Sequence, residues 1–179
     1  MKGLLSLSRG IDWLNDRFAV FAKWAVLASC LISAANAVVR YVFNYSSNAF
    51  TEIQWYLFAA CVMLGAAQVM RVNEHVRVDV LYGMYSGRTQ AKIDLAGMLL
   101  FVVPVMAVLV YYCLPLFLQM LRTGEMSSNA GGLIRWPAMM MLPLGFALLL
   151  LQAVSEAIKR VAWLTHQYEG DFHYERPLQ

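Results

Sequence analysis

The sequence predicts an all-α integral membrane protein with four transmembrane helices, and two observations support this fold class. First, 60% of the 179 residues are hydrophobic and only 14% are charged, whereas a typical soluble domain has about 25% charged residues. Second, the charges are absent from four long apolar windows and crowded between them. About 20 apolar residues in a helix cross the hydrocarbon core of a bilayer. Long unbroken windows favour helices over the alternating strands of a membrane barrel.

The apolar windows define the expected spans in order along the chain: 20–43, 52–70, 95–121 and 136–157. We therefore expect a single membrane domain, 1–165, followed by a short tail, 166–179. A cleaved signal peptide is the alternative explanation of the first window. The segment before that window is long and contains Asp12 and Asp16, which argues against cleavage.

Lysine and arginine residues fall mostly on one side of the expected membrane. Eleven of the fourteen lie in the N-terminal segment, the second loop and the C-terminal tail, and the other three are Arg40, Arg122 and Arg135 in the first and third loops. Because loops rich in lysine and arginine remain in the cytoplasm, we expect both termini and the second loop to be cytoplasmic.

The N-terminal segment predicts an amphipathic helix that lies on the membrane surface. Apolar residues recur at steps of three and four along it: Leu4, Leu7, Ile11, Leu14 and Phe18. Polar and charged residues lie largely on the rest of the helix surface, which is typical of an interfacial helix. The alternative is a frayed terminus that merely precedes the first span.

Ionisable residues are absent from the middle of every expected span, where they commonly mark transport paths. Arg40 and Glu52 lie at the two ends of the short first loop. We expect them to form an ion pair that closes this helical hairpin, and a contact with a partner protein is the alternative.

Small residues repeat every four positions along the first span, at Ala25, Ser29, Ser33 and Ala37, and Gly65 lies in the second. Small faces let helix backbones approach closely in lipid, so we expect these residues to pack against a partner subunit, with packing within the chain as the alternative. Four spans without a charged interior are too few to enclose a path for a solute. The sequence therefore predicts a protein that supports a membrane process without carrying the chemistry itself.

The sequence contains none of the common motifs of metal-binding, phosphate-binding or nucleophilic sites. Cys30, Cys61 and Cys113 all lie inside expected spans and form no CxxC pair, so we expect neither a disulfide nor a metal site. The three histidines lie outside the apolar windows, which argues against haem. No phosphate-binding loop, zinc spacing or nucleophile elbow is present, and nothing indicates a nucleic-acid partner. We therefore expect no cofactor and no catalytic residue.

The second loop carries charges of both signs that alternate with valines from Val76 to Val80. Its basic residues can bind the phosphate headgroups of anionic lipids. We expect a cytoplasmic structural or lipid-headgroup cluster here, made of Arg71, Glu74, His75, Arg77, Asp79, Arg88 and Lys92. A proton or sodium relay is the alternative, but nothing connects this loop across the bilayer.

Four motifs in this order resemble the small membrane subunit of tripartite ATP-independent periplasmic (TRAP) transporters, the DctQ-type family. They are Arg40-Tyr41-Val42-Phe43-Asn44, Glu52 with Trp55, Gly65-Ala66-Ala67, and Glu74-His75-Val76-Arg77-Val78-Asp79. The third loop, Ser127 to Pro137, and Pro143 to Phe146 are similar to a branch of the same family. One departure is that Glu52 has Thr51 and Ile53 beside it, where the family often has a second acidic residue.

The resemblance implies a scaffold subunit of a secondary transporter in a bacterial inner membrane. Its large membrane partner would work as an elevator and hold the substrate and sodium sites, and a periplasmic binding protein would deliver organic acid anions. The first and third loops would face the binding protein, so the candidate contacts are Ser46, Asn48, Arg122, Glu125, Ser128, Asn129 and Arg135. For each of these the alternative is a solvated loop residue.

Two other functions are compatible with four spans. One is an integral membrane enzyme that holds an anionic cofactor such as glutathione with charged residues at its helix ends. The other is a self-sufficient homodimeric exporter, which usually needs a carboxylate deep in its bundle, and the expected spans contain none.

Overall fold

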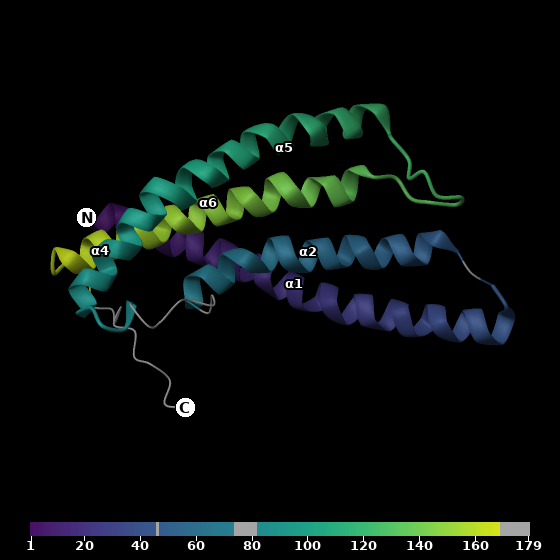
Figure 1. The fold of residues 1–179 in the computed structure, drawn as a ribbon, viewed down its shortest axis with the longest axis horizontal. Coiled ribbons are helices and arrows are strands. Elements are labelled where there is room, and N and C mark those ends of the chain that lie inside the picture. Colours follow the sequence, from purple (N-terminus) through teal and green to yellow (C-terminus); the bar gives the residue numbers. More distant parts are fainter. Residues whose placement is uncertain (46, 74–81, 169–179) are drawn as a thin grey trace.

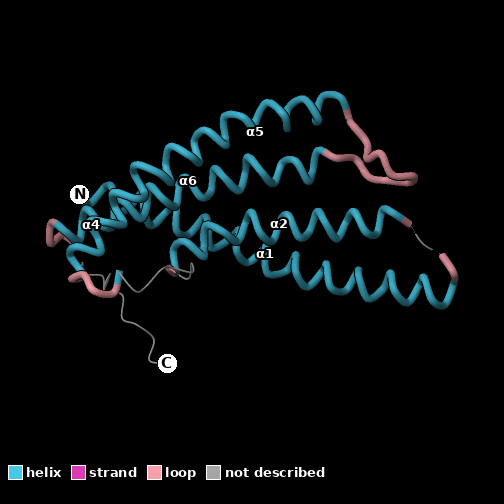
Figure 2. Tube along the Cα trace, viewed as in Figure 1, coloured by secondary structure: helices cyan, strands magenta, loops and turns pink. Residues whose placement is uncertain are grey.

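The computed structural model describes the whole chain except residues 46, 74–81 and 169–179. Apart from one isolated β-bridge, every regular element in this part is helical (Figures 1 and 2). The elements are α1 (Lys2–Phe43), α2 (Asn48–Val72), α4 (Gly87–Gly97), the π-helical turn η1 (Met98–Val102), α5 (Val103–Thr123) and α6 (Trp136–Leu164).

Four helices are long and apolar enough to cross a membrane: α1, α2, the continuous segment Gly87–Thr123, and α6. Each contains one of the expected spans, so the all-helical, four-span architecture predicted from the apolar windows is confirmed. The structure extends the first helix by 18 residues beyond the N-terminal end of the expected span 20–43.

The helices end where residues with unusual backbone freedom occur. Asn44, Asn73 and Gly124 follow α1, α2 and α5 and all adopt left-handed conformations, with φ of 48°, 61° and 61°. Asparagine and glycine tolerate this conformation better than other residues. Ser47 starts α2, because its side-chain oxygen accepts a hydrogen bond from the backbone N–H of Ala49 at 3.3 Å.

The third span, Gly87–Thr123, is one continuous helical segment in which the π-helical turn η1 separates α4 from α5. Pro104 is the second residue after this turn. Proline lacks a backbone N–H and clashes with the preceding turn of a regular α-helix, and a π-helical turn is a common way to absorb such a defect.

The helices form an open layer in the order α5, α6, α2, α1 (Figure 1). Ala22, Ala25, Ala60, Leu64, Ala67 and Leu148 form a buried cluster between α1, α2 and α6. The close approach of α2 and α6 depends on Gly145, where a Cβ would lie 2.8 Å from the backbone oxygen of Met63. In α5, all of which the structure describes, no residue is buried.

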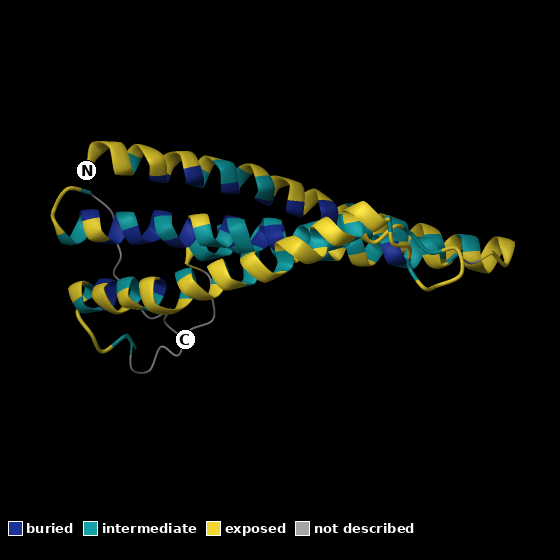
Figure 3. Cartoon of the chain, turned by 90° about the horizontal axis from the view of Figure 1, so that it is seen from above, coloured by how far each residue is buried: buried dark blue, intermediate teal, exposed yellow. Residues whose placement is uncertain are grey.

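The N-terminal segment is not a separate interfacial helix, because α1 runs without a break from Lys2 to Phe43. A helix of this length measures about 63 Å at a rise of 1.5 Å per residue, roughly twice the hydrocarbon thickness of a bilayer. Ser8, Ile11 and Asn15 are buried, and α1 contacts α6 as well as α2. Figure 3 shows these buried positions recurring along one side of the N-terminal half of the helix.

Candidate functional site

The layer of helices has two ends that differ in the segments they carry. The loop end carries the first loop and the third loop (124–135), and the terminal end carries the N-terminus, α4 and the last turns of α6 (Figure 1). The described residues contain no group of three or more His, Cys, Asp or Glu side chains placed to hold a metal ion.

The third loop folds into a short hairpin between α5 and α6. Met126 and Ile134 form an antiparallel bridge. The N–H of Ser127 donates to the carbonyl of Leu133 at 2.8 Å, and the N–H of Arg135 donates to the carbonyl of Glu125 at 2.9 Å. Backbone hydrogen bonds therefore give this loop a defined shape.

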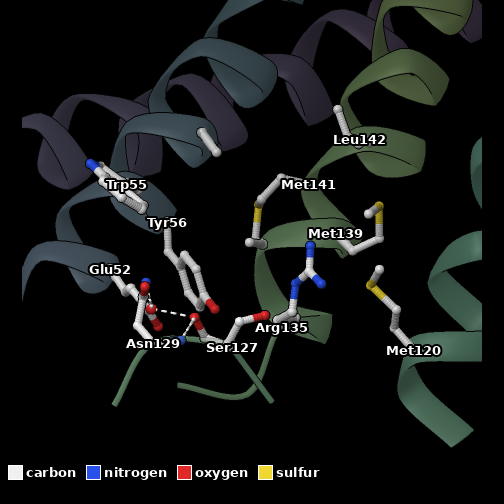
Figure 4. Close-up of a pocket in the computed structure, with 13 residues that line it drawn as sticks. Glu52, Trp55, Tyr56, Met120, Ser127, Asn129, Arg135, Met139, Met141 and Leu142 are labelled. Atoms are coloured by element: carbon white, nitrogen blue, oxygen red, sulfur yellow. Dashed lines mark hydrogen bonds between the residues drawn. The ribbon is translucent and has the colours of Figure 1, made fainter. Parts of the chain in front are cut away.

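Glu52, in the first turns of α2, holds this hairpin in place. One oxygen of its carboxylate accepts from the hydroxyl of Ser127 and, at 2.8 Å, from the side-chain amide of Asn129. The other oxygen accepts from the backbone N–H of Leu133 at 2.7 Å. Glu52 is only 3% exposed. We call these four residues the third-loop clamp, and Figure 4 shows Ser127 and Asn129 pointing at the carboxylate.

Further contacts between α2 and the hairpin reinforce the clamp. The side-chain amide of Asn48 donates to the carbonyl of Ala130 at 2.9 Å, and the hydroxyl of Tyr56 donates to the carbonyl of Ile134 at 3.1 Å. Gly132 has no room for a side chain, since a Cβ there would lie 2.6 Å from the Cβ of Ser127 and 2.9 Å from Glu52. The hairpin and the start of α2 thus behave as one unit.

A cavity of about 520 Å³ lies beside the clamp, between α2, the end of α5 and the start of α6. Its walls are mostly apolar and include Trp55, Tyr56, Met120, Met139 and Met141 (Figure 4). Methionine side chains adapt to irregular apolar shapes, so the cavity suits a hydrocarbon chain or an apolar side chain.

The structure brings most of the predicted binding-protein contacts together at the loop end. Asn48 and Asn129 help to fix the hairpin, Ser128 lines the cavity, and Arg135 forms an ion pair with Glu125. Arg122 is exposed near the end of α5. Ser46 lies outside the described residues. Whether these residues contact a partner protein stays a prediction.

The predicted ion pair between Arg40 and Glu52 does not form in the part of the chain that the structure describes. The third-loop clamp uses the carboxylate of Glu52 instead, because the hairpin brings three donors to it. Arg40 lies in a separate groove of about 660 Å³ at the loop end of α1 and α2. We call this the Arg40 groove, and its lining is Ser33, Asn36, Ala37, Arg40, Tyr41, Asn44, Thr51 and Gln54.

The predicted partner-packing residues divide into two groups. Ala25 belongs to the buried cluster within the chain, and Gly65 lies against Ala22, 3.7 Å from where its Cβ would be. These two positions therefore pack α1 against α2. Ser29 is half-buried, whereas Ser33 and Ala37 are exposed, so only the second half of the stripe is open to another protein.

The basic residues flanking the second loop have partners within the chain. Arg71 forms an ion pair with Asp16 of α1 at 2.6 Å, and Arg88 contacts the ring nitrogen Nε2 of His166. Lys92 is exposed on α4. The remaining members of the predicted cluster, Glu74, His75, Arg77 and Asp79, lie outside the described residues.

A second charged cluster, which the sequence analysis missed, lies at the terminal end. Arg160 of α6 binds Glu156 through Nη1 at 2.7 Å and Asp94 of α4 through Nη2 at 3.0 Å. Lys159 binds Asp12 of α1 and Glu156, both at 2.7 Å. We call these five residues the terminal-end network. They join α1, α4 and α6 through side chains that are mostly inaccessible to solvent.

Neutral hydrogen bonds continue the network along α1 and α6. The side-chain amide of Asn15 donates to Gln152 at 2.6 Å, and the hydroxyls of Ser8 and Ser155 lie 2.7 Å apart. Gln152 also donates to Asp12 at 3.0 Å. The sequence signal for this network was the spacing of Glu156, Lys159 and Arg160, which places both cations one turn after the acid.

Asp12 and Lys159 lie outside the expected spans, and each stabilises the charged form of the other. Burial opposes ionisation of Asp12, but the hydrogen bonds from Lys159 and Gln152 outweigh it and hold the pKa of the carboxyl below its ordinary value. Burial likewise disfavours the Lys159 ammonium, yet its bonds to Asp12 and Glu156 raise its pKa. Both groups are therefore charged at neutral pH.

A family model described as "Tripartite ATP-independent periplasmic transporters, DctQ component" matches residues 29–162. No curated protein and no solved structure matches the chain.

Proposed function

Because the chain belongs to the DctQ component family of TRAP transporters, we propose that it serves as the non-transporting small subunit of such a transporter. It is a fixed support for a large membrane subunit, which moves as an elevator and binds both the solute and sodium. The transported solutes are organic acid anions, delivered by a periplasmic binding protein. The small subunit itself needs no cofactor.

The observation that carries this proposal is the open layer of four helices. In the order α5, α6, α2, α1, each helix contacts its neighbours in the layer, and the described residues do not surround a polar path along the helices. Their buried charged side chains lie at the two ends of the layer, with Glu52 in the third-loop clamp and the terminal-end network at the opposite end. A transporter needs polar groups that line a route for its solute, whereas a support needs rigid helices and outer faces.

The proposed orientation places the loop end in the periplasm and both termini in the cytoplasm of a bacterial inner membrane. The distribution of lysine and arginine supports it, with eleven of fourteen expected on the cytoplasmic side. In this orientation the third-loop clamp presents a preformed hairpin to the binding protein. Exposed polar residues such as Ser128 and Arg135 are then available for contact.

The first turns of α1 lie at the cytoplasmic membrane surface in this arrangement. Leu4, Leu7 and Trp13 are about half exposed, and the guanidinium of Arg17 lies 5.2 Å from the ring centre of Trp13. Exposed apolar side chains beside basic and aromatic ones suit the boundary between lipid and water.

The two alternative functions gain no support from the geometry. An enzyme that holds glutathione needs several basic side chains gathered at one open site. Arg160 and Lys159 are paired with acids of the chain, and among the described residues Arg40 is the one basic residue that lines its groove. A homodimeric exporter needs a membrane-embedded carboxylate that can exchange ions, whereas Glu52 is held by three donors at the loop end.

Uptake in cells tests the proposal. A bacterium without its own TRAP transporter would express the chain with the large subunit and binding protein of the same transporter. Radiolabelled organic acid anions should then accumulate with all three proteins, and omission of this chain should abolish accumulation although the large subunit still reaches the membrane. Undiminished accumulation without this chain would refute the proposed role.

A further inference from the structure

The Arg40 groove is a polar recess at the loop end, separate from the third-loop clamp. It is formed by the last three turns of α1 and the first turns of α2, and its volume is about 660 Å³. Polar side chains from both helices line it, including Asn36, Arg40, Thr51 and Gln54. All of its lining residues belong to α1, α2 or Asn44, which follows α1, and the loop-end half of α1 lies at the edge of the layer away from α5 and α6 (Figure 1).

Two side chains of this groove, Arg40 and Asn36, lack an ion-pair or hydrogen-bond partner among the described residues. Arg40 has no carboxylate within ion-pair distance, since Glu52 belongs to the third-loop clamp. Asn36 lies one helical turn before Arg40 on the same face, and its amide oxygen is enclosed without a hydrogen-bond partner. Unpaired polar groups are costly where water is excluded. An occupant of the groove would therefore need to supply a carboxylate for Arg40 and a hydrogen-bond donor for the amide oxygen of Asn36.

We propose that the Arg40 groove receives a transmembrane helix of the large subunit, and that a carboxylate on that helix pairs with Arg40. This inference rests on the proposed function, because it names the surface that contacts the partner. Charge complementarity supports it, since a guanidinium binds a carboxylate through two parallel hydrogen bonds. Ser33 and Ala37 also line the groove, and small side chains allow a second helix to approach closely.

A phospholipid phosphate could pair with Arg40, but it would not satisfy the rest of the groove. Arg40 lies near the end of α1, where lipid headgroups begin. Asn36 lies about 6 Å deeper and Ser33 about 10 Å deeper at 1.5 Å per residue. A lipid offers only hydrocarbon at that depth, whereas a protein helix can bring a polar side chain to Asn36. These positions favour a helix as the occupant.

The opposite edge of the layer suits lipid better. The loop end of α5 exposes many apolar side chains, among them Leu114, Leu116, Leu118 and Leu121, together with the polar Gln119 and Arg122. Among the described residues of this edge, no enclosed polar atom lacks a hydrogen-bond partner, in contrast to Asn36 in the Arg40 groove. This difference between the two edges favours a position of the large subunit beside α1 and α2.

Recovery of the two-subunit complex tests this inference. The large subunit would carry the affinity tag, and the amount of this chain that co-purifies in mild detergent would be measured for the wild type, Arg40→Glu, Arg40→Gln and Asn36→Leu. Arg122→Glu is the matched control, because it makes the same charge change at the loop end of α5. Circular dichroism of each variant would check that its helices form.

We expect Arg40→Glu and Arg40→Gln to lower recovery at least about tenfold, because removing one partner of a desolvated charge pair is costly. Asn36→Leu should lower it less, and Arg122→Glu should leave it unchanged. Replacing the pairing acid of the large subunit with arginine should restore the complex of Arg40→Glu.

Wild-type recovery of both Arg40 variants would overturn the inference while leaving the proposed function intact. An intact complex that has lost bound phospholipid, as measured by native mass spectrometry, would also overturn it and assign the groove to lipid. Absence of any complex with the wild-type chain would instead refute the proposed function itself.

Discussion

Replacement of Arg160 by methionine tests the terminal-end network most sharply. Arg160 is only 3% exposed, and its guanidinium bridges Glu156 on its own helix and Asp94 on α4. Methionine keeps much of the apolar stem but removes the charge. The three carboxylates of the network would then share one cation, Lys159, instead of two.

The expected loss follows from this charge imbalance. Removing one partner of a buried ion pair costs about 3–5 kcal/mol, because the remaining charge is left without compensation. We therefore expect the free energy of unfolding of Arg160→Met to fall by roughly that amount. Adding Asp94→Asn removes one of the carboxylates that have lost their contact with Arg160, so the double variant should recover about 1–3 kcal/mol of the loss.

Reversible unfolding in mixed micelles of mild detergent and dodecyl sulfate, followed by tryptophan fluorescence, measures these free energies. Arg122→Met is the matched control, because Arg122 is exposed near the end of α5, and its effect should stay within about 0.5 kcal/mol. A loss below about 1 kcal/mol for Arg160→Met, or simple addition of the two single effects in the double variant, would refute the energetic role of the network.

Two further changes address other parts of the fold. Glu52→Gln should speed proteolysis of the third loop, because Leu133 and Asn129 lose a charged acceptor. The control is Glu125→Gln. Equally slow cleavage of the two variants would contradict the role of the third-loop clamp in holding the hairpin. Gly145→Leu should lower the free energy of unfolding by about 1–3 kcal/mol or more through overpacking against Met63, and unfolding in the same mixed micelles would detect it. Wild-type stability in Gly145→Leu would show that α2 and α6 do not meet closely there.

The number and position of the transmembrane helices could be predicted because they depend on local composition. An uncharged apolar window must be helical in lipid whatever surrounds it. The boundary before residue 20 could not be predicted in the same way. Asp12 and Asn15 were among the polar residues that gave the N-terminal segment an amphipathic pattern, but both of them bind side chains of α6.

The partners of charged residues were harder to predict, because they depend on tertiary contacts. Arg40 and Glu52 are close in sequence, so an ion pair between them was the simplest hypothesis. The donors that Glu52 uses lie 75 or more positions away in the third loop. Lys159 and Arg160 were counted only as positive charge flanking the last span, although the acids that bind them lie on α1, α4 and α6.

Solute flux in reconstituted vesicles tests the central claim most directly. The purified chain alone, the large subunit alone, and the two together would each be placed in liposomes with an imposed sodium gradient and the binding protein outside. We expect uptake of an organic acid anion only when both membrane subunits are present. Uptake by this chain alone, at a rate that depends on its amount, would show that it forms a transport path and would contradict its role as a support.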